Sequence, residues 1–171
     1  WLGAQGEDWE RGPYYLDGLI PLAYLLENEE LIEKSQKWIE WTLDSQDNNG
    51  DFGPRTNPDW WPRMVQLKVL IQYYQFTTDE RVIGFMDRYF RYQHRTLPDI
   101  PLKNWAVPRS GDNIYSVLWL YNRTKEPYLL ELVEILHQQG TDWMQFFTDF
   151  PLTSSAKEHV PWQVLEELGD Q

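Results

Sequence analysis

The sequence predicts an all-α fold in which helical hairpins form half of a closed (α/α)6 toroid. Three times, a helix that is apolar all round is followed by a tight break, a helix with one apolar stripe and a longer loop. The breaks contain the related positions Asn28, Asp79 and Lys125, which are 51 and 46 residues apart. Such periods are typical of stacked hairpins. Alternating fully apolar and one-sided helices predict an inner and an outer layer, and a closed ring explains buried inner helices better than an open solenoid does.

The first hairpin is expected at residues 13–46. Pro13 opens its inner helix, because a proline in the first turn loses no hydrogen bond there. This helix runs to about Glu27 with apolar side chains around its whole circumference, so we expect it to be buried on all sides. The outer helix, 29–45, has one apolar stripe opposite a charged face and should have one side in water.

The second hairpin, residues 60–95, follows a long loop at 47–60 that is rich in turn-forming residues. Asp59 is expected to cap its inner helix, and Pro62 falls in the first turn. The third hairpin, residues 112–139, follows a second long loop, and Asp112 is expected to cap its inner helix.

Residues 140–171 have a looser pattern than the three hairpins. We expect a short helix at 143–147 and a last helix at 162–168, with Glu158 and His159 between them. The sequence predicts no second domain, so 1–171 is treated as one all-α segment.

The composition excludes several classes of function. The 171 residues carry 15 basic and 27 acidic side chains, a net charge of −12, which makes nucleic acid an unlikely partner by electrostatics. No apolar run approaches the ~20 residues of a membrane span. There is no cysteine and no phosphate-binding or nucleophile-elbow motif. His94 and His137 lie late in outer helices, where structural roles are expected, so the sequence predicts no metal site and no cofactor within this chain.

The long loops should all lie at one end of the array, beside the partly positive N-termini of the inner helices. Tryptophans, arginines and carboxylates gather there, a combination that suits a carbohydrate, because flat rings cover its apolar face and charged groups bind its hydroxyls. Glu10 and Asp112 are the candidate catalytic carboxylates, since glycoside hydrolysis uses such a pair. The candidate substrate-binding residues are Trp9, Arg11, Trp60, Trp61, Arg63, Trp105, Arg109 and Asn113.

Each of these residues also has a simpler interpretation. Glu10 could stabilise a helix dipole, Asp112 could be only a cap, and the arginines could pair locally. Trp105 could do no more than fix its loop against the core. Only their expected placement at one end of the array favours a binding site.

Four runs resemble the N-terminal half of glycoside hydrolase family 127, the β-L-arabinofuranosidase-like proteins. They are WERGPYYLDGLIPLAYLLENEELIEKSQKWIEWTLDSQ, DWWPRMVQLKVLIQYYQ, DERVIGFMDRYFRYQ and SGDNIYSVLWLYNRT. The resemblance covers about residues 9–150. It implies a six-hairpin catalytic (α/α)6 barrel followed by β-sandwich domains, and hydrolysis of L-arabinofuranosides or related plant-type glycans.

The resemblance further implies that members of the family use a cysteine nucleophile held by zinc and a glutamate acid/base. These residues are expected in the later part of the barrel. This chain has no cysteine, so no catalytic residue is transferred to it, and zinc is expected only in a full-length protein. We expect the chain to be a piece of a longer, periplasmic or secreted protein, inactive alone, with the rest of the barrel packed on its inner helices. The alternative is a non-catalytic helical-repeat module that binds carbohydrate or peptide.

Overall fold

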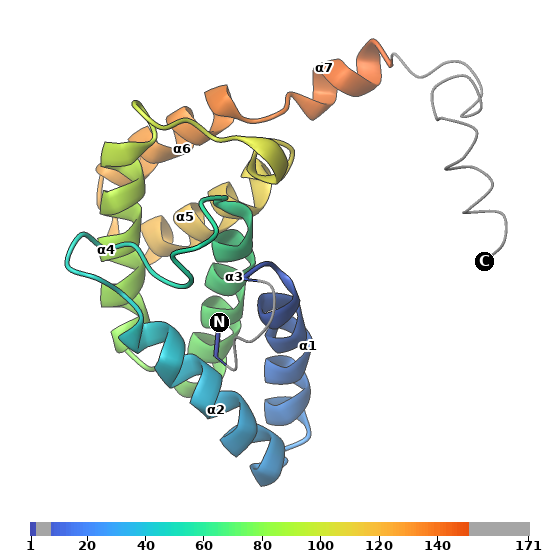
Figure 1. Ribbon diagram of the computed structural model, residues 1–171, viewed down its shortest axis with the longest axis vertical. Coiled ribbons are helices and arrows are strands. Elements are labelled where there is room, and N and C mark those ends of the chain that lie inside the picture. The colour runs from blue at the N-terminus through green and yellow to red at the C-terminus, as the bar shows by residue number, and fades with distance from the viewer. Residues whose placement is uncertain (3–7, 151–171) are drawn as a thin grey trace, which may run out of the picture. The chain divides into compact units, whose positions relative to one another are not determined.

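The computed structural model describes residues 1–2 and 8–150, and in them the chain is helical with no strand (Figure 1). This confirms the predicted all-α class. The chain divides into two compact units, residues 1–141 and 142–171, which are described separately. The described part of the second unit contains α7 (Trp143–Thr148), close to the expected short helix. The expected helix at 162–168, Glu158 and His159 lie outside the described residues.

Six helices of the first unit form three consecutive hairpins. Their bounds are α1 (Arg11–Leu25), α2 (Glu29–Asp44), α3 (Trp61–Thr77), α4 (Arg81–Thr96), α5 (Ser110–Thr124) and α6 (Tyr128–Gln139). Helix α3 packs between α1 and α5, and α4 packs between α2 and α6, so the odd-numbered helices form one layer and the even-numbered helices another (Figure 1). This is the two-layer arrangement expected from the alternating hydrophobic patterns.

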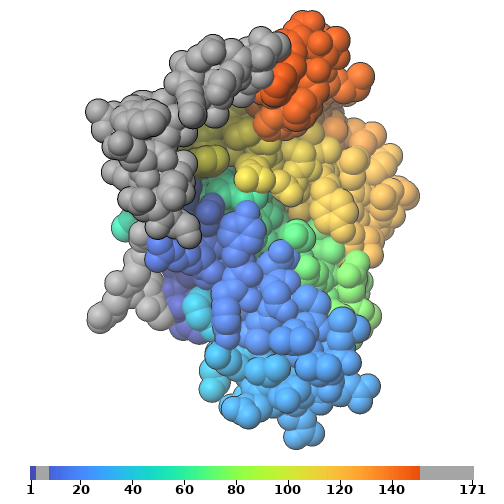
Figure 2. Space-filling model, turned by 90° about the vertical axis from the view of Figure 1, so that its right-hand side faces the viewer, coloured from blue at the N-terminus to red at the C-terminus, as the bar shows by residue number. Residues whose placement is uncertain are grey.

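The middle helix of the inner layer, α3, is the most buried of the three, although Phe76 in its last turn is 41% exposed. Eleven of the 17 residues of α3 are buried, including the polar Gln66. The prediction of complete burial was wrong for α1, where Leu22 and Leu25 are exposed, and for α5, where Tyr115 and Leu118 are exposed. Within the described chain, α1 and α5 each have an inner-layer neighbour on one side only, and Figure 2 looks onto the face where both helices flank α3.

The helix starts differ from the sequence prediction at three places. Helix α1 begins at Arg11, so Pro13 lies inside its first turn. Helix α5 begins at Ser110, so Asp112 is a first-turn acid rather than the predicted N-cap. The N-cap residue of α3 is Trp60 rather than the predicted Asp59, and the Asp59 carboxylate accepts the Trp61 backbone N–H at 2.9 Å from one residue before the cap.

The three tight breaks share a backbone conformation that the sequence did not reveal. Each contains one non-glycine residue in the left-handed region: Glu27 (φ 51°), Thr78 (φ 54°) and Lys125 (φ 59°). This conformation ends a helix by redirecting the chain after its last turn. It is uncommon outside glycine and asparagine, so side-chain patterns do not signal it.

No helix in residues 1–2 and 8–150 is long and apolar enough to cross a membrane.

Candidate functional site

The first turns of the three inner helices meet around a small cavity of about 90 Å³, named here the inner pocket. Its lining residues are Tyr14, Trp61, Met64, Val65, Lys68, Arg109 and Asp112. They come from α1, α3, and the start of α5, which are separate in sequence. Of the residues predicted for the site, Trp61, Arg109 and Asp112 line this cavity.

Trp61 lies at the centre of this group and is only 4% exposed. Its indole Nε1–H donates a hydrogen bond to the Glu10 carboxylate. The Tyr14 ring packs against it edge-on, with ring centres 6.0 Å apart. The Arg109 guanidinium lies over the same indole, 4.9 Å from the ring centre. The indole therefore fixes one carboxylate, one phenol and one cation relative to one another.

The charges of the inner pocket act on the Tyr14 hydroxyl. Burial raises the pKa of Tyr14, the Glu10 and Asp112 carboxylates raise it further, and the Arg109 cation opposes them. Both candidate catalytic carboxylates therefore lie within electrostatic reach of one phenol. Tyr14 remains a neutral hydroxyl near neutral pH, able both to donate and to accept a hydrogen bond.

Lys68 is a pocket residue that the sequence reasoning missed. Its ammonium lies 2.9 Å from Asp17 of α1, and the hydrogen bond from Lys68 to that carboxylate raises the pKa of the lysine. Gln72 donates to the other Asp17 oxygen at 2.9 Å. The sequence did contain one signal for Lys68: it is seven residues after Trp61 and so lies on the same face of the helix.

Several predicted site residues lie away from the inner pocket. Asn113 is fully buried and donates to Gln93 of α4 at 3.0 Å. Trp105 lies in the short 3₁₀ helix η1 (Asn104–Ala106) and is 58% exposed. Trp9 is half-buried against the core, and its backbone carbonyl accepts the Trp1 indole N–H at 2.6 Å. Arg11 is exposed on the first turn of α1.

Arg63 is directed into the 47–60 loop rather than toward the inner pocket. It is 5% exposed, and Nε bonds the Asp51 carboxylate at 3.0 Å. Its guanidinium also donates to four loop carbonyls at 2.9–3.2 Å, those of Phe52, Pro54, Asn57 and Asp59. Because these carbonyls have no partner in a helix or sheet, Arg63 supplies the hydrogen bonds that hold the loop in shape.

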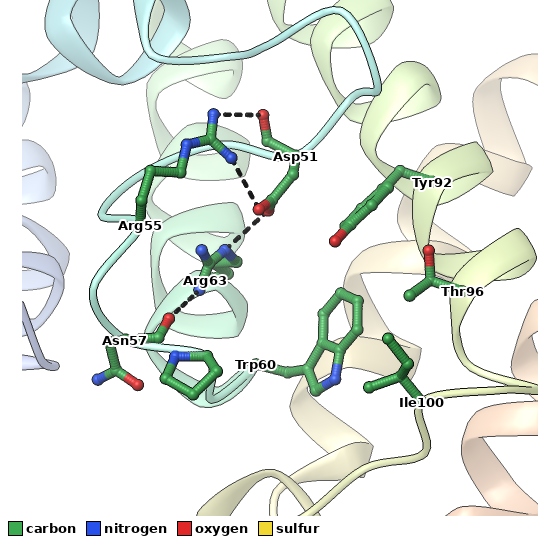
Figure 3. A pocket seen from close by; sticks show the side chains of 9 residues that line it. Asp51, Arg55, Asn57, Trp60, Arg63, Tyr92, Thr96 and Ile100 are labelled. Carbon is green, nitrogen blue, oxygen red and sulfur yellow. Dashed lines mark hydrogen bonds and ion pairs between the residues drawn. The ribbon is translucent and has the colours of Figure 1, made fainter.

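Trp60 and Trp61 are adjacent in sequence but line different cavities. Trp60 packs with Tyr89 and Tyr92 of α4, and it lines a separate cavity between the loop and that helix (Figure 3). Although both were predicted to bind the substrate, the two tryptophans therefore do not line one common site.

Neither a metal site nor a known relative identifies the chemistry. Among residues 1–2 and 8–150, no group of three or more histidine, cysteine or acidic side chains could hold a metal ion. Comparisons of the chain with protein-family models, curated proteins and solved structures find no match.

Proposed function

We propose that this chain is part of a carbohydrate-active glycoside hydrolase, and that the inner pocket contacts the sugar. The observation that carries the proposal is the meeting of Glu10, Trp61 and Arg109 at the starts of the inner helices. These residues come from three hairpins, and their side chains are positioned by direct contacts with one another.

The chemistry of the pocket matches a polyhydroxylated ligand. The Tyr14 ring, 44% exposed, provides an apolar face at the pocket mouth, and its hydroxyl can donate or accept. Asp112 accepts hydrogen bonds, while Lys68 and Arg109 donate them. The positive ends of the helix dipoles favour bound oxygen atoms at the same place. The small volume suits one edge of a sugar ring rather than a whole oligosaccharide.

The substrate class rests on the resemblance to the β-L-arabinofuranosidase-like family, which implies L-arabinofuranosides or related plant-type glycans. In a complete barrel, further hairpins would cover the exposed apolar face of α1 and α5, and would contribute a zinc-held cysteine and a glutamate acid/base. Glu10 and Asp112 would then bind and orient the sugar. That the complete protein forms a six-hairpin (α/α)6 toroid and binds zinc is part of this proposal.

The proposal is tested first by binding. The 171-residue chain is titrated with methyl β-L-arabinofuranoside and followed by NMR chemical shifts, for the wild type and for Arg109→Ala and Asp112→Asn. Binding is expected in the wild type and should weaken at least tenfold in both variants. Lys37→Ala, on the outer helix α2, removes an exposed cation and should leave binding unchanged.

The second test separates an enzyme from a binding module. The longer protein that contains this chain is incubated with aryl β-L-arabinofuranosides, and arabinose release is measured. Arabinose release by the wild type that is lower in the Arg109→Ala variant supports a hydrolase. Binding without release from any arabinofuranoside would favour the helical-repeat carbohydrate-binding module, and absence of both would refute the proposed function.

A further inference from the structure

The chain contains one Asn-Gly pair, Asn49 and Gly50, in the turn that opens the 47–60 loop. Asparagine followed by glycine is especially prone to spontaneous deamidation, because glycine has no side chain to shield its backbone nitrogen. In this reaction the Gly50 nitrogen attacks Cγ of Asn49, the side-chain NH₂ leaves with the proton of that nitrogen as ammonia, and a succinimide ring forms. Water then opens the ring to aspartate or isoaspartate. Asn49 is exposed to the water that this step consumes.

The backbone nitrogen of Gly50 is held by Asp47. Its N–H donates both to the backbone carbonyl and to the carboxylate Oδ1 of Asp47, each at 3.0 Å. The same Oδ1 accepts the backbone N–H groups of Asn49 at 2.9 Å and of Asp51 at 3.1 Å. Attack on Asn49 requires the Gly50 nitrogen to lose its proton, and a proton bonded to a carboxylate is lost less readily. Asp47 therefore keeps the nucleophile of the reaction protonated.

The peptide unit between Asn49 and Gly50 is also restrained against the rotation that ring closure needs. Arg95 donates to the Asn49 carbonyl at 3.0 Å, and Gln46 donates to the Gly50 carbonyl at 3.0 Å. Gly50 is buried with a φ of 99°, and its Cα lies so near the Arg88 carbonyl that an added Cβ would collide with it. The Gly50 nitrogen therefore has little freedom to turn toward the Asn49 side chain.

We propose that Asn49 is a latent deamidation site, which the folded turn keeps unreactive through the hydrogen bond from the Gly50 nitrogen to the Asp47 carboxylate. Unfolding the chain or removing this acceptor frees the nitrogen to react. Isoaspartate would add one carbon to the backbone of a turn that is closed by the Asp47 N–H and the Asp51 carbonyl at 2.8 Å. Asp51 pairs with Arg63 at 3.0 Å, so a changed turn would disturb the bonds that hold the 47–60 loop. This site does not line the inner pocket and does not depend on the proposed function.

The first test compares the folded and the unfolded chain. The 171-residue chain is incubated at mildly alkaline pH with and without urea, and peptide mapping by mass spectrometry follows the replacement of the Asn49 amide by a carboxyl group. Deamidation of Asn49 should be at least tenfold slower in the folded chain than in urea. Asn48 is exposed in the same turn but precedes asparagine instead of glycine, so it should react slowly under both conditions. Equal rates at Asn49 with and without urea would overturn the proposal.

The second test removes the acceptor. Asp47→Ala should speed deamidation of the folded chain at least fivefold, whereas Asp47→Asn keeps a side-chain oxygen that can accept the Gly50 N–H and should preserve most of the protection. Glu33→Ala removes an exposed carboxylate of α2 and should have no effect. Equal rates in wild type and Asp47→Ala, or equally fast reaction in both Asp47 variants, would refute the role of this hydrogen bond.

Hydrogen exchange of the Gly50 amide in the folded wild type gives a measurement that needs no variant. The hydrogen bonds to Asp47 predict strong protection of this amide relative to the chain in urea. Exchange of the Gly50 amide at the unprotected rate would overturn the proposal even if Asp47→Ala does not fold.

Discussion

The Arg109 guanidinium lies 4.9 Å from the centre of the Trp61 ring, so a cation at the start of α5 covers an indole at the start of α3. Arg109 is exposed whereas Trp61 is buried. The contact therefore presents a positive charge at the surface of the inner pocket without burying it, which suits a residue that binds a ligand.

Arg109→Ala should separate binding from stability. Removing an exposed cation–π contact is expected to lower the free energy of unfolding by about 1 kcal/mol or less. The affinity for methyl β-L-arabinofuranoside should nevertheless fall at least tenfold. Urea denaturation and NMR titration of the same preparation measure both quantities. A large loss of stability with unchanged affinity would assign Arg109 a purely structural role.

Arg63→Met should be far more destabilising than Arg55→Met, although both arginines pair with Asp51. Arg63 is buried and donates to four loop carbonyls, and its loss is expected to cost about 3 kcal/mol or more. The Arg55 side chain is 47% exposed, and its loss should cost about 1 kcal/mol or less. Urea denaturation gives both values, and equal losses would contradict the proposed role of Arg63 in the loop.

Gly50→Ala and Gly18→Ala should have opposite effects on stability. Gly50 has a φ of 99°, and a Cβ there would collide with the Arg88 carbonyl, so a loss of about 2 kcal/mol or more is expected. Gly18 lies inside α1 with no atom near an added Cβ, and alanine there should add about 0.5–1 kcal/mol. The midpoint of thermal unfolding should fall for the first variant and rise for the second.

The pairing of Arg81 with Glu40 and Asp79 should make the folded protein lose stability at acid pH. Hydrogen bonds from Arg81 lower the pKa values of Glu40 and Asp79 below their ordinary values of 4.5 and 3.8. A depressed folded-state pKa stabilises the protein above the unfolded value, and this stabilisation is lost as pH falls through both values. Arg81→Gln should therefore lose less stability than wild type between pH 6 and pH 3. Urea denaturation at several pH values measures the difference, which should be small because Arg81 and Glu40 are substantially exposed. Identical pH profiles would show that the pairs contribute nothing.

The two faces of α1 should respond differently to truncation. Ile20 is fully buried, so Ile20→Ala is expected to cost about 2–4 kcal/mol. Leu25 is 73% exposed, so Leu25→Ser should change stability by about 0.5 kcal/mol or less in this chain. The same Leu25 change should reduce self-association in analytical ultracentrifugation, because it breaks an exposed apolar patch. A cost for Leu25→Ser near that of Ile20→Ala would mean that this face is covered.

By itself, the sequence determined that the chain is all-α, that six helices form three hairpins, and that these hairpins repeat at related breaks. Hydrophobic periodicity carries this information because the burial of each face is encoded locally. The sequence also identified Glu10, Trp61, Arg109 and Asp112 as residues at the starts of inner helices.

Only the tertiary structure decided where the adjacent side chains point. It separates Trp60 from Trp61, turns Arg63 into the loop and buries Asn113 against Gln93. It also shows that only α3 is surrounded, although α1 is equally apolar in pattern. Periodicity indicates which residues can be buried, but the neighbour that buries them comes from contacts between segments far apart in the chain, which no local pattern contains.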